Sequence, residues 1–362
     1  MENRNTNNSL HKAKISKTDE FYTQISDIEK ELKHYRHHFK DKVVFCNCDD
    51  PRVSNFFLYF SLNFEKLGLK KLITTCYKNQ NAELFSSHDC EKAIYLEYTS
   101  DKNSKSLESE IKYLEGDGDF RSPECINLLN ESDIVVTNPP FSLFREYVIQ
   151  LFEHNKKFII IGNFNMISYK EIFSLIREDK LWLGYTHPVQ FIVPDHYEIR
   201  ENRSWRDENG INWRSLGNAC WFTNLDIKKR HEDLILYKRY DPVQYPIYDN
   251  YDAINVDKSS DIPCDFQGCM GVPITFLDKY NPEQFEIIAL GIVGSIDFTC
   301  NKKMEILDKN GLPTGKMTYN AKGTLYRLYN PKTDRKPAFR NSETGELYRS
   351  IYARVIIKNK RI

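Results

Sequence analysis

Residues 133–144 decide the fold, and they read Asp-Ile-Val-Val-Thr-Asn-Pro-Pro-Phe-Ser-Leu-Phe. The β-branched run at 134–136 has no polar alternation, which is typical of a parallel strand covered on both faces. Two consecutive prolines then remove two backbone donors and end the strand. Apolar residues at three- and four-residue spacing over 143–152 predict an amphipathic helix. Asn138 should therefore lie at the carboxyl end of a strand, where open α/β sheets bind their ligands.

The turn Asn138-Pro139-Pro140-Phe141 suits chemistry on an exocyclic amine, whose delocalised lone pair makes it a poor nucleophile. Two fixed acceptors aimed at the amine hydrogens localise that lone pair. The side-chain oxygen of Asn138 and the carbonyl of Pro139 can supply them, because the proline turn cannot relax. The ring of Phe141 offers a face on which a planar base can stack. A structural Asn-Pro turn is the alternative, but the second proline, the aromatic residue and the apolar strand favour catalysis.

Strands and helices alternate through the first 235 residues. This order predicts an α/β fold with a doubly wound, mostly parallel, Rossmann-like sheet. A further short helix is expected at 281–290, because Asn281-Pro282 resembles a helix start. Strands are predicted at 43–46, 72–77, 134–137, 157–163, 181–184 and 220–225, and helices at 27–39, 54–64, 143–152 and 169–178.

The composition is that of a folded globular protein with room for two domains: 362 residues, 40% hydrophobic and 28% charged. No apolar run approaches the roughly 18 to 20 residues that a membrane-spanning helix needs. The first ten residues are polar, and nothing resembles a signal or transit peptide, so we expect a cytoplasmic protein. Nine cysteines without Cys-x-x-Cys spacing indicate reduced thiols and no metal site.

The charges are unevenly distributed along a chain whose formal net charge is zero. Residues 301–362 contain 15 Lys and Arg against 5 Asp and Glu, a net charge of +10. Such a region can form a phosphate-binding surface, although an ordinary solvated basic tail explains the charge equally well. Turn-rich segments at 308–311 and 341–345 predict two hairpins in it.

Several segments resemble a known family. Residues 133–141 are similar to the catalytic Asn-Pro-Pro-aromatic motif of S-adenosylmethionine-dependent amino-methyltransferases. Together with residues 17–23, 45–57, 116–122 and 271–277, they resemble EcoRI-type adenine-specific DNA modification methylases. The resemblance runs from about residue 9 to about residue 290 and returns in the last ten residues. The motif order resembles the gamma arrangement, which implies a methyltransferase sheet followed by a basic C-terminal target-recognition region.

The resemblance implies that S-adenosylmethionine is the cofactor. The acidic turn after the first strand lacks the glycine-rich sequence of most such enzymes, and which of its two aspartates faces the cofactor stays open. Taken alone, residues 18–23 would equally form a helix cap, and Asp-Gly-Asp at 117–119 a surface turn. The implied cofactor-binding residues are Thr18, Asp19, Phe21, Tyr22, Cys48, Asp49, Asp50, Asp117, Asp119, Phe120 and Asn138.

The resemblance also implies site-specific methylation of adenine N6 in double-stranded DNA, with the target base flipped into a pocket. Asn138, Pro139, Pro140 and Phe141 would be catalytic. Phe141 and Trp221 would line the base pocket, with core packing as the alternative for Trp221. The expected DNA contacts are Lys14, Lys17, Arg327, Arg335, Lys336 and Arg340.

The predicted domains are a disordered segment at 1–10, a catalytic domain at 11–235 and a recognition region at 236–362. Elements of the catalytic domain are expected to recur near 270–290 and 352–362. The enzyme would act as a monomer, in functional partnership with a restriction endonuclease, and GAATTC is a candidate site. Methylation of cytosine N4 or protein glutamine, and a non-catalytic DNA-binding role, are the alternatives.

Overall fold

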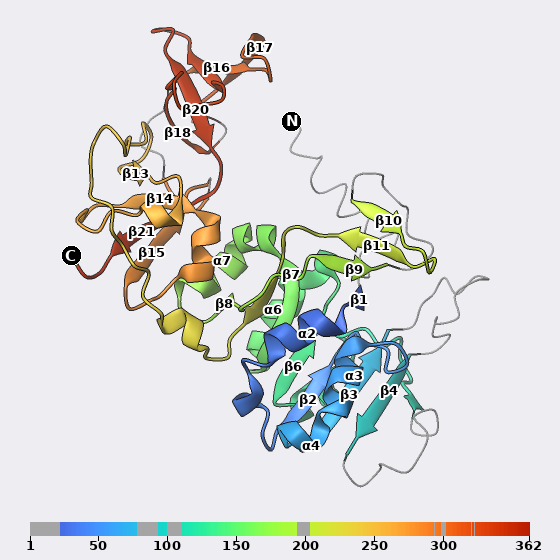
Figure 1. Cartoon of the computed structure of the whole chain (residues 1–362). Helices are drawn as coiled ribbons and strands as arrows, with labels where there is room; N and C mark the ends of the chain where they lie inside the picture. Colours follow the sequence, from blue (N-terminus) through green and yellow to red (C-terminus); the bar gives the residue numbers. More distant parts are fainter. Residues whose placement is uncertain are drawn as a thin grey trace. The chain divides into compact units, whose positions relative to one another are not determined.

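The computed structural model describes residues 22–77, 93–99, 111–193, 203–292, 294–297, 302–319, 321 and 323–362. The chain divides into two compact units. The first holds the residues up to Ile172 together with Lys180–Ile227, and the second holds Phe173–Asp179 together with Lys228–Ile362. The first unit runs from blue to yellow-green in Figure 1, and the second comprises the short green segment Phe173–Asp179 and the chain from yellow to red. Which unit carries catalysis and which carries recognition stays a prediction at this point.

The first unit is built on an eight-stranded sheet with the order β5-β4-β3-β2-β6-β7-β12-β8. Its central strands are buried on both faces, and β2 and β6 contain no exposed residue. The strands are β2 Val43–Cys46, β3 Lys71–Cys76, β4 Ile94–Tyr98, β5 Lys112–Tyr113, β6 Ile134–Thr137, β7 Lys157–Asn163, β8 Trp182–Leu183 and β12 Ala219–Thr223.

The sheet is mixed, so the prediction of a mostly parallel sheet is confirmed only in part. Parallel pairing joins β2 to β3, β2 to β6, and β6 to β7. At one end of the sheet β4 pairs with β3 and with β5, and at the other end β12 pairs with β7 and with β8. These four pairs are antiparallel. Both β7 and β8 run against β12, which inserts between them, so β7 and β8 are parallel to each other without being paired. Apolar runs identify buried strands but do not give their direction.

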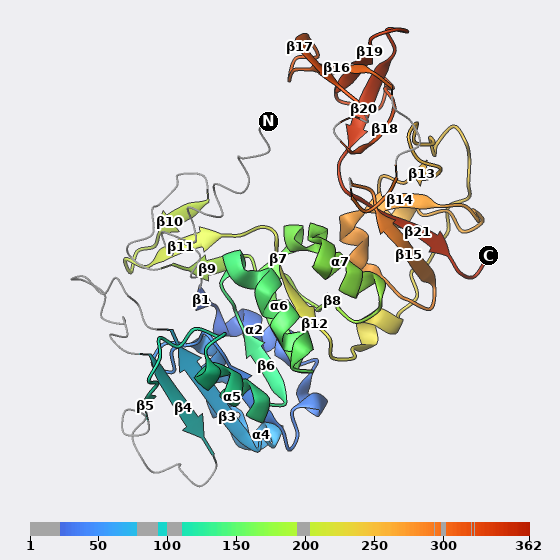
Figure 2. The same cartoon turned by 180° about the vertical axis from the view of Figure 1, so that it is seen from behind.

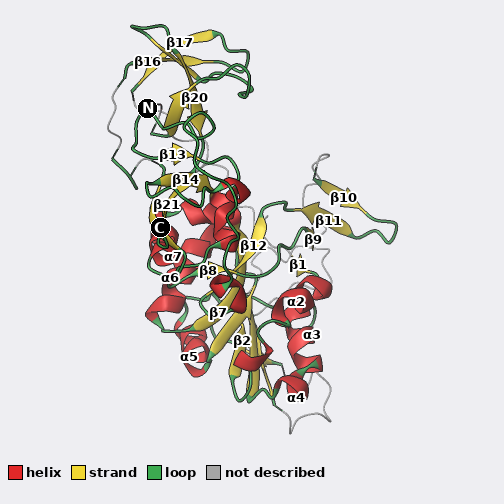
Figure 3. Cartoon of the chain, turned by 60° about the vertical axis from the view of Figure 1, so that its left-hand side comes forward, coloured by secondary structure: helices red, strands yellow, loops and turns green. Residues whose placement is uncertain are grey.

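Helices cover both faces of this sheet. Figures 1 and 3 show α2 Ile25–Leu32, α3 Asn55–Leu62 and α4 Phe64–Leu67 on one face. Figure 2 shows α5 Pro123–Glu131 and α6 Phe144–Glu153 on the other. The Ser54 side chain caps α3 by accepting hydrogen bonds from two backbone amides. The predicted apolar stripe of α6 is confirmed, because Phe144, Tyr147, Val148 and Leu151 are its buried residues.

A second, four-stranded sheet of the first unit has the order β1-β9-β11-β10, and all its pairs are antiparallel. Its strands are β1 Tyr22–Thr23, β9 Gln190–Ile192, β10 Ser204–Arg206 and β11 Asn212–Ser215. The remaining helix, α7 Lys170–Arg177, confirms the prediction at 169–178. Short 3-10 turns lie at η1 Arg36–His38, η4 Phe141–Leu143 and η5 Phe164–Ser168.

The second unit contains two sheets, with the orders β13-β14-β21-β15 and β17-β16-β19-β20-β18. The strands of the first are β13 Ile254–Asn255, β14 Met270–Pro273, β15 Phe285–Leu290 and β21 Arg354–Asn359. Those of the second are β16 Met304–Leu307, β17 Pro313–Thr318, β18 Leu325–Leu328, β19 Phe339–Asn341 and β20 Leu347–Ile351. Its 3-10 turns are η6 Lys228–His231, η7 Ser259–Asp261 and η8 Ile274–Lys279. The segments near 270–290 and 352–362 therefore meet in the first of these sheets.

The helix predicted at 281–290 was wrong. Asn281 begins a turn, with its side chain accepting from the Glu283 amide, and β15 follows. The buried residues of β15 largely alternate with exposed ones, as the period of a strand requires. Both predicted hairpins are confirmed: β16 pairs with β17 across 308–311, and β19 pairs with β20 across 341–345.

No helix in the parts of the chain that the structure describes is long and apolar enough to cross a membrane.

Candidate active site

The candidate site lies where β2, β3 and β6 end. β2 and β6 are parallel neighbours, with Phe45 opposite Val135. The acidic turn at 47–50 and the Asn138 turn therefore follow adjacent strands at the same edge of the sheet. This is the edge where open α/β sheets bind ligands, and the strand and turn predicted around Asn138 are confirmed.

The carboxylate of Asp49 is the centre of a hydrogen-bond network at this edge. Ser54 donates to Oδ1 over 2.8 Å, and the Oγ1 of Thr137 lies 2.6 Å from Oδ2. The Asp49 amide donates to the Thr75 carbonyl over 2.8 Å, and the Thr75 hydroxyl donates to the side-chain oxygen of Asn47 over 2.9 Å. The Thr137 hydroxyl also contacts the Asn47 carbonyl. The end of β6 is thus tied to the carboxyl group of Asp49, and the end of β3 is tied to its backbone.

The protonation of Asp49 is poised near neutrality. Removal of the carboxyl group from water raises its pKa, and the hydrogen bonds from Thr137 and Ser54 oppose this effect only in part. The resulting pKa is about 7, against an ordinary value of 3.8. Asp49 therefore changes charge close to neutral pH.

Asp50, the next residue, has a different role in the turn. Its carboxylate accepts from the Arg52 backbone amide and from the Arg52 guanidinium, at 2.5 to 3.2 Å. Asp50 is therefore held by a local ion pair, which leaves Asp49 as the acid tied to the strand ends. Cys48 between Asn47 and Asp49 adopts φ +69°, a left-handed conformation that usually requires glycine. The missing glycine-rich loop is thus replaced by a cysteine in a glycine-like conformation.

The Asn138 turn leads directly into helix. The Pro140 carbonyl accepts from the Leu143 amide over 3.0 Å, which starts η4 and then α6. Asn138 and Pro140 are half-buried, and Pro139 is buried. Phe141 is only 9% exposed, so a base in contact with it would reach a small part of the ring.

The turn at 117–120 joins the site through α6. The Asp119 amide donates to Oδ1 of Asp117, and Gly118 between them has φ +76°. The ring of Phe120 is buried and packs edge-on against Tyr147 of α6, with their centroids 5.0 Å apart. Burial raises the pKa of Tyr147, and the nearby Asp49 adds to this effect. The predicted residues of 117–120 and 48–50 therefore border the same helix.

The carboxylate of Asp119 is bound on its own turn by Arg121, whose guanidinium donates to both oxygens over 2.7 and 2.8 Å. Asp117 makes no such pair within the described residues. Burial raises the pKa of Tyr77 at the end of β3, and the charges of Asp117 and Asp119 raise it further. Tyr77 thus lies beside this turn.

Of the predicted N-terminal cofactor residues, only Tyr22 is described. It is half-buried in β1, where it pairs with Ile192. Asn55, the first residue of α3, donates to the Thr23 carbonyl over 2.7 Å. The start of the described chain is therefore bonded to the helix that Ser54 caps. Lys14, Lys17, Thr18, Asp19 and Phe21, and the segment 1–10, lie outside the described residues.

Trp221 does not fit a base pocket. It is fully buried in the middle of β12 and packs edge-on against Phe56 of α3, with centroids 6.1 Å apart. Its Cβ lies 2.7 Å from the position that a side chain at Gly184 would occupy, so the ring is enclosed by the core. An aromatic residue in a strand can pack in the core or bind a ligand, and its burial in the structure distinguishes the two roles.

The predicted DNA-contacting residues of the second unit fall into two groups. Arg327 is buried, and its guanidinium binds both oxygens of Asp334 over 2.7 and 2.8 Å. This burial does not fit a direct contact with DNA. Arg335, Lys336 and Arg340 are exposed, and Arg340 pairs with Glu305.

Sequence reasoning missed three polar residues at the site, namely Thr75, Thr137 and Tyr147. Thr75 and Thr137 are polar residues at the ends of apolar strands, and this is the signal that could have identified them.

Comparison with known proteins decides the family. The family model for the adenine-specific methyltransferase EcoRI matches residues 9–360. The chain belongs to this family. As a member of the EcoRI family, it is an adenine-specific DNA methyltransferase of the restriction-modification type.

Three curated relatives of this chain are named type II methyltransferases. The type II methyltransferase M.EcoRI of Escherichia coli is 58% identical over 292 residues, which cover 78% of this chain and 89% of the relative. M.MgeORF184P of Mycoplasma genitalium is 39% identical over 287 residues, covering 77% and 85%. M.MpnI of Mycoplasma pneumoniae is 39% identical over 285 residues, covering 77% and 84%. No solved structure matches the chain significantly.

Proposed function

We propose that this enzyme methylates adenine N6 within a specific duplex sequence, by direct transfer to a base flipped out of the helix. The observation that carries the proposal is the position of the Asn138-Pro139-Pro140-Phe141 turn, at the end of a buried strand beside the acidic turn of the neighbouring strand. A chemical group bound at one turn would lie close to a group bound at the other.

The residues at this edge fit S-adenosylmethionine as the methyl donor. This cofactor carries positive charge and ribose hydroxyls but no phosphate, so carboxylates suit it better than a glycine-rich anion cradle. Asp49 and Asp117 would hold its polar groups, and Phe120 and Tyr147 would enclose the site beside them. When bound, S-adenosylmethionine supplies an electrophilic methyl group.

Asn138 and Pro139 would act on the adenine amine. The side-chain oxygen of Asn138 and the carbonyl of Pro139 accept its two hydrogens and so localise the nitrogen lone pair. Pro140 restricts the turn, and Phe141 contacts the face of the base. No cysteine is needed, because the reaction involves no covalent enzyme intermediate.

We assign binding of duplex DNA to the second unit, on the exposed cations Arg335, Lys336 and Arg340. The enzyme would act as a monomer alongside a restriction endonuclease of the same specificity. GAATTC is the candidate sequence that the resemblance to EcoRI-type methylases implies.

Methylome sequencing of a methylation-deficient host tests the proposal. The wild-type chain should produce N6-methyladenine in a single sequence motif, and the Asn138→Ala variant should produce none while still binding S-adenosylmethionine in calorimetry. N4-methylcytosine in the wild-type host would favour the cytosine alternative. A nearly full rate in the Asn138→Ala variant would contradict the assigned mechanism.

A further inference from the structure

The five-stranded sheet of the second unit is inserted between two strands that pair with each other. β15 ends at Leu290 and β21 begins at Arg354, yet Leu290 lies opposite Val355 in their antiparallel ladder. The Gly291 amide donates to the Arg354 carbonyl over 2.7 Å, so the chain leaves and re-enters at one place. Strands β16 to β20 all lie within this excursion. We call residues 302–351 the inserted module.

The inserted module has its own core and is bound to the rest of the second unit by specific contacts. Its core consists of Met304, Ala321, Tyr326, Phe339 and Tyr348. Two residues that precede β13 bind the module. The Asn250 side chain donates to the Thr324 carbonyl over 2.9 Å, and the Asp249 amide donates to the Tyr326 carbonyl over 2.9 Å. The Asp249 carboxylate also pairs with Lys302 at 2.5 Å. The module is therefore an ordered element of the second unit.

One face of the module's sheet is partly exposed, although Arg327 on it is buried. Strand register places Glu305 opposite Arg340, Arg340 opposite Leu347, and Arg327 opposite Arg349. The tyrosines at 326 and 348 point to the other face, into the core. The side chains of Arg340 and Arg349 are 45% and 37% exposed. Two arginines thus stand on a surface that no other described element covers completely.

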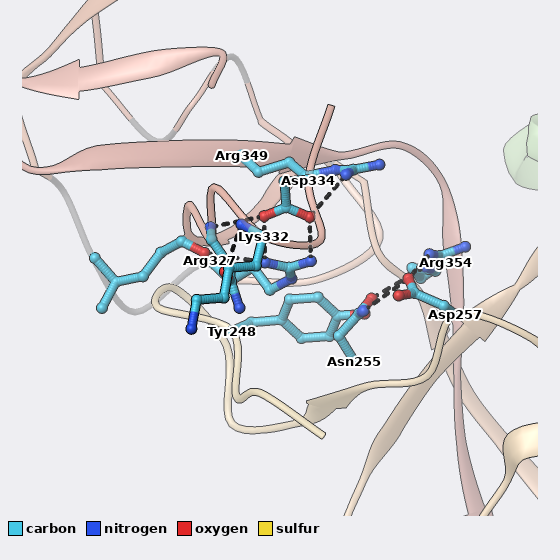
Figure 4. A network of polar contacts seen from close by, with 10 residues as sticks. Tyr248, Asn255, Asp257, Arg327, Lys332, Asp334, Arg349 and Arg354 are labelled. Carbon is cyan, nitrogen blue, oxygen red and sulfur yellow. Dashed lines mark hydrogen bonds and ion pairs between the residues drawn. The ribbon is translucent and has the colours of Figure 1, made fainter. Parts of the chain in front are cut away.

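A buried carboxylate holds a basic loop against this face. Asp334 is 1% exposed at its side chain, and it binds Arg327 and Arg349 over 2.7 to 2.8 Å. It also accepts from the Asn330 amide over 2.9 Å. Figure 4 shows Asp334 between the two guanidinium groups, with Lys332 from the same loop beside them. The loop that carries Asp334 can therefore separate from the sheet only by breaking the buried ion pair of Asp334 with Arg327.

This arrangement collects five cations, Lys332, Arg335, Lys336, Arg340 and Arg349, which we call the basic face. Lys332, Arg335 and Lys336 are exposed, and none of them forms an ion pair with a described residue. Among the described residues, the ion pairs of the basic face involve two carboxylates, Asp334 beneath it and Glu305 on Arg340. It is therefore a surface of net positive charge on an ordered support.

We propose that the inserted module binds the phosphate backbone of duplex DNA through the basic face, adding affinity without reading the target sequence. This inference rests on the proposed function. The side chains of Lys332, Arg335 and Lys336 form no hydrogen bond with a described residue, whereas base readout needs fixed, bidentate donors. Long flexible cations instead match phosphates, which are sequence-independent.

A module inserted between paired strands can be gained without changing the sheet that receives it. Its contribution to DNA binding would then add to that of the rest of the chain.

The test replaces three cations of the basic face: Lys332→Gln, Arg335→Gln and Lys336→Gln in one full-length variant. The matched control replaces three exposed lysines elsewhere, Lys70→Gln, Lys258→Gln and Lys279→Gln, which removes the same charge. Fluorescence anisotropy measures binding to a duplex that contains the target sequence and to a duplex that lacks it, across a range of salt concentrations. The methylated motif itself is read by sequencing.

We expect the basic-face variant to lose affinity for both duplexes by the same factor, on the order of tenfold or more. The slope of log binding constant against log salt concentration should be smaller in magnitude by about three. The control variant should change much less, and the methylated motif should stay the same in both. An altered motif, or a loss confined to the specific duplex, would show that the module reads bases. Equal binding by wild type and variant would show that it does not contact DNA.

These outcomes are independent of the proposed chemistry. Binding is measured without turnover, so a wild-type chain that methylates nothing would refute the proposed function and leave the binding comparison valid.

Discussion

The hydroxyl of Thr137 lies 2.6 Å from Oδ2 of Asp49, although 88 residues separate the two in sequence. The same hydroxyl contacts the carbonyl of Asn47. A hydroxyl has one proton, so it can donate to only one of these acceptors at a time. With Asp49 protonated, Asp49 donates to Thr137 and Thr137 donates to Asn47. With Asp49 ionised, the Thr137 proton turns to the carboxylate, so the charge of Asp49 is coupled to the contact between β2 and β6.

Replacing Thr137 by Val should raise the pKa of Asp49 above about 7, because the ionised form loses a donor. Cofactor affinity measured by calorimetry across pH 6 to 9 should then have its midpoint at higher pH than in the wild type. The free energy of unfolding should fall by about 1 kcal/mol through the lost hydrogen bond. Thr137→Ser keeps the hydroxyl and should restore the wild-type midpoint. Identical profiles for the Val and Ser variants would contradict this role.

Asp49 should make cofactor binding depend on pH, while Asp50 should not. Below its pKa of about 7 the Asp49 carboxyl is neutral, so the affinity for the positively charged cofactor should fall as pH drops through this value. Asp49→Asn should bind weakly at pH 8 and show a flat profile. Asp50→Asn is the matched control, because its carboxylate is already held by Arg52. A flat profile in Asp50→Asn and a sloping one in Asp49→Asn would reverse the assignment.

Gly118 should tolerate no side chain. Its φ is +76°, and a Cβ there would lie 2.6 Å from the Cys76 carbonyl oxygen and 2.9 Å from the Ala93 Cβ. Gly118→Ala must therefore displace the turn that carries Asp117 and Asp119, and we expect at least a tenfold loss in cofactor affinity. Gly315→Ala is the control, because Gly315 has φ +73° and open space around it. It should cost only about 1 kcal/mol in stability, from the left-handed conformation. Equal effects of the two substitutions on cofactor affinity would show that backbone strain alone is responsible.

The strands and helices around Asn138 could be predicted because their signals are local. The apolar run before Asn138, the paired prolines and the helical spacing after them act over a dozen residues, and the structure confirms all three. The Ser54 cap is also a local signal. Strand direction is different, because the antiparallel insertion of β12 between β7 and β8 depends on the path of the whole chain.

The residues that support the site could not be predicted for the same reason. Thr137 and Asp49 meet only because two parallel strands are neighbours, and the ion pair of Arg327 with Asp334 depends on a loop folding back. In sequence, Arg327 looks like any exposed arginine of a basic region. Trp221 likewise looks equally suited to a pocket or a core, and its complete burial is decided by the packing of α3.

The ion pair of Arg327 with Asp334 should be a major stabilising contact of the inserted module. The two side chains are 6% and 1% exposed, so Asp334→Ala leaves a buried charge without its partner. We expect a loss of roughly 3 to 5 kcal/mol in the stability of the module. Glu305→Ala removes the partner of Arg340, which is 45% exposed, and should cost less than about 1 kcal/mol. Comparable losses in the two variants would contradict the importance of burial.

The measurement must report on the second unit, and tryptophan fluorescence does not, because all four tryptophans (Trp182, Trp205, Trp213 and Trp221) lie in the first. Hydrogen–deuterium exchange of peptides from 302–351 is therefore the suitable readout.

Burial alone would raise the pKa of Asp334, but Arg327, the Asn330 amide and Arg349 together lower it below its ordinary value of 3.8. A lowered folded-state pKa means that this stabilisation is present above about pH 4 and is lost as pH falls through the folded-state pKa. The difference in exchange between wild type and Asp334→Ala should therefore be full at pH 7 and should shrink once the pH falls below about 4.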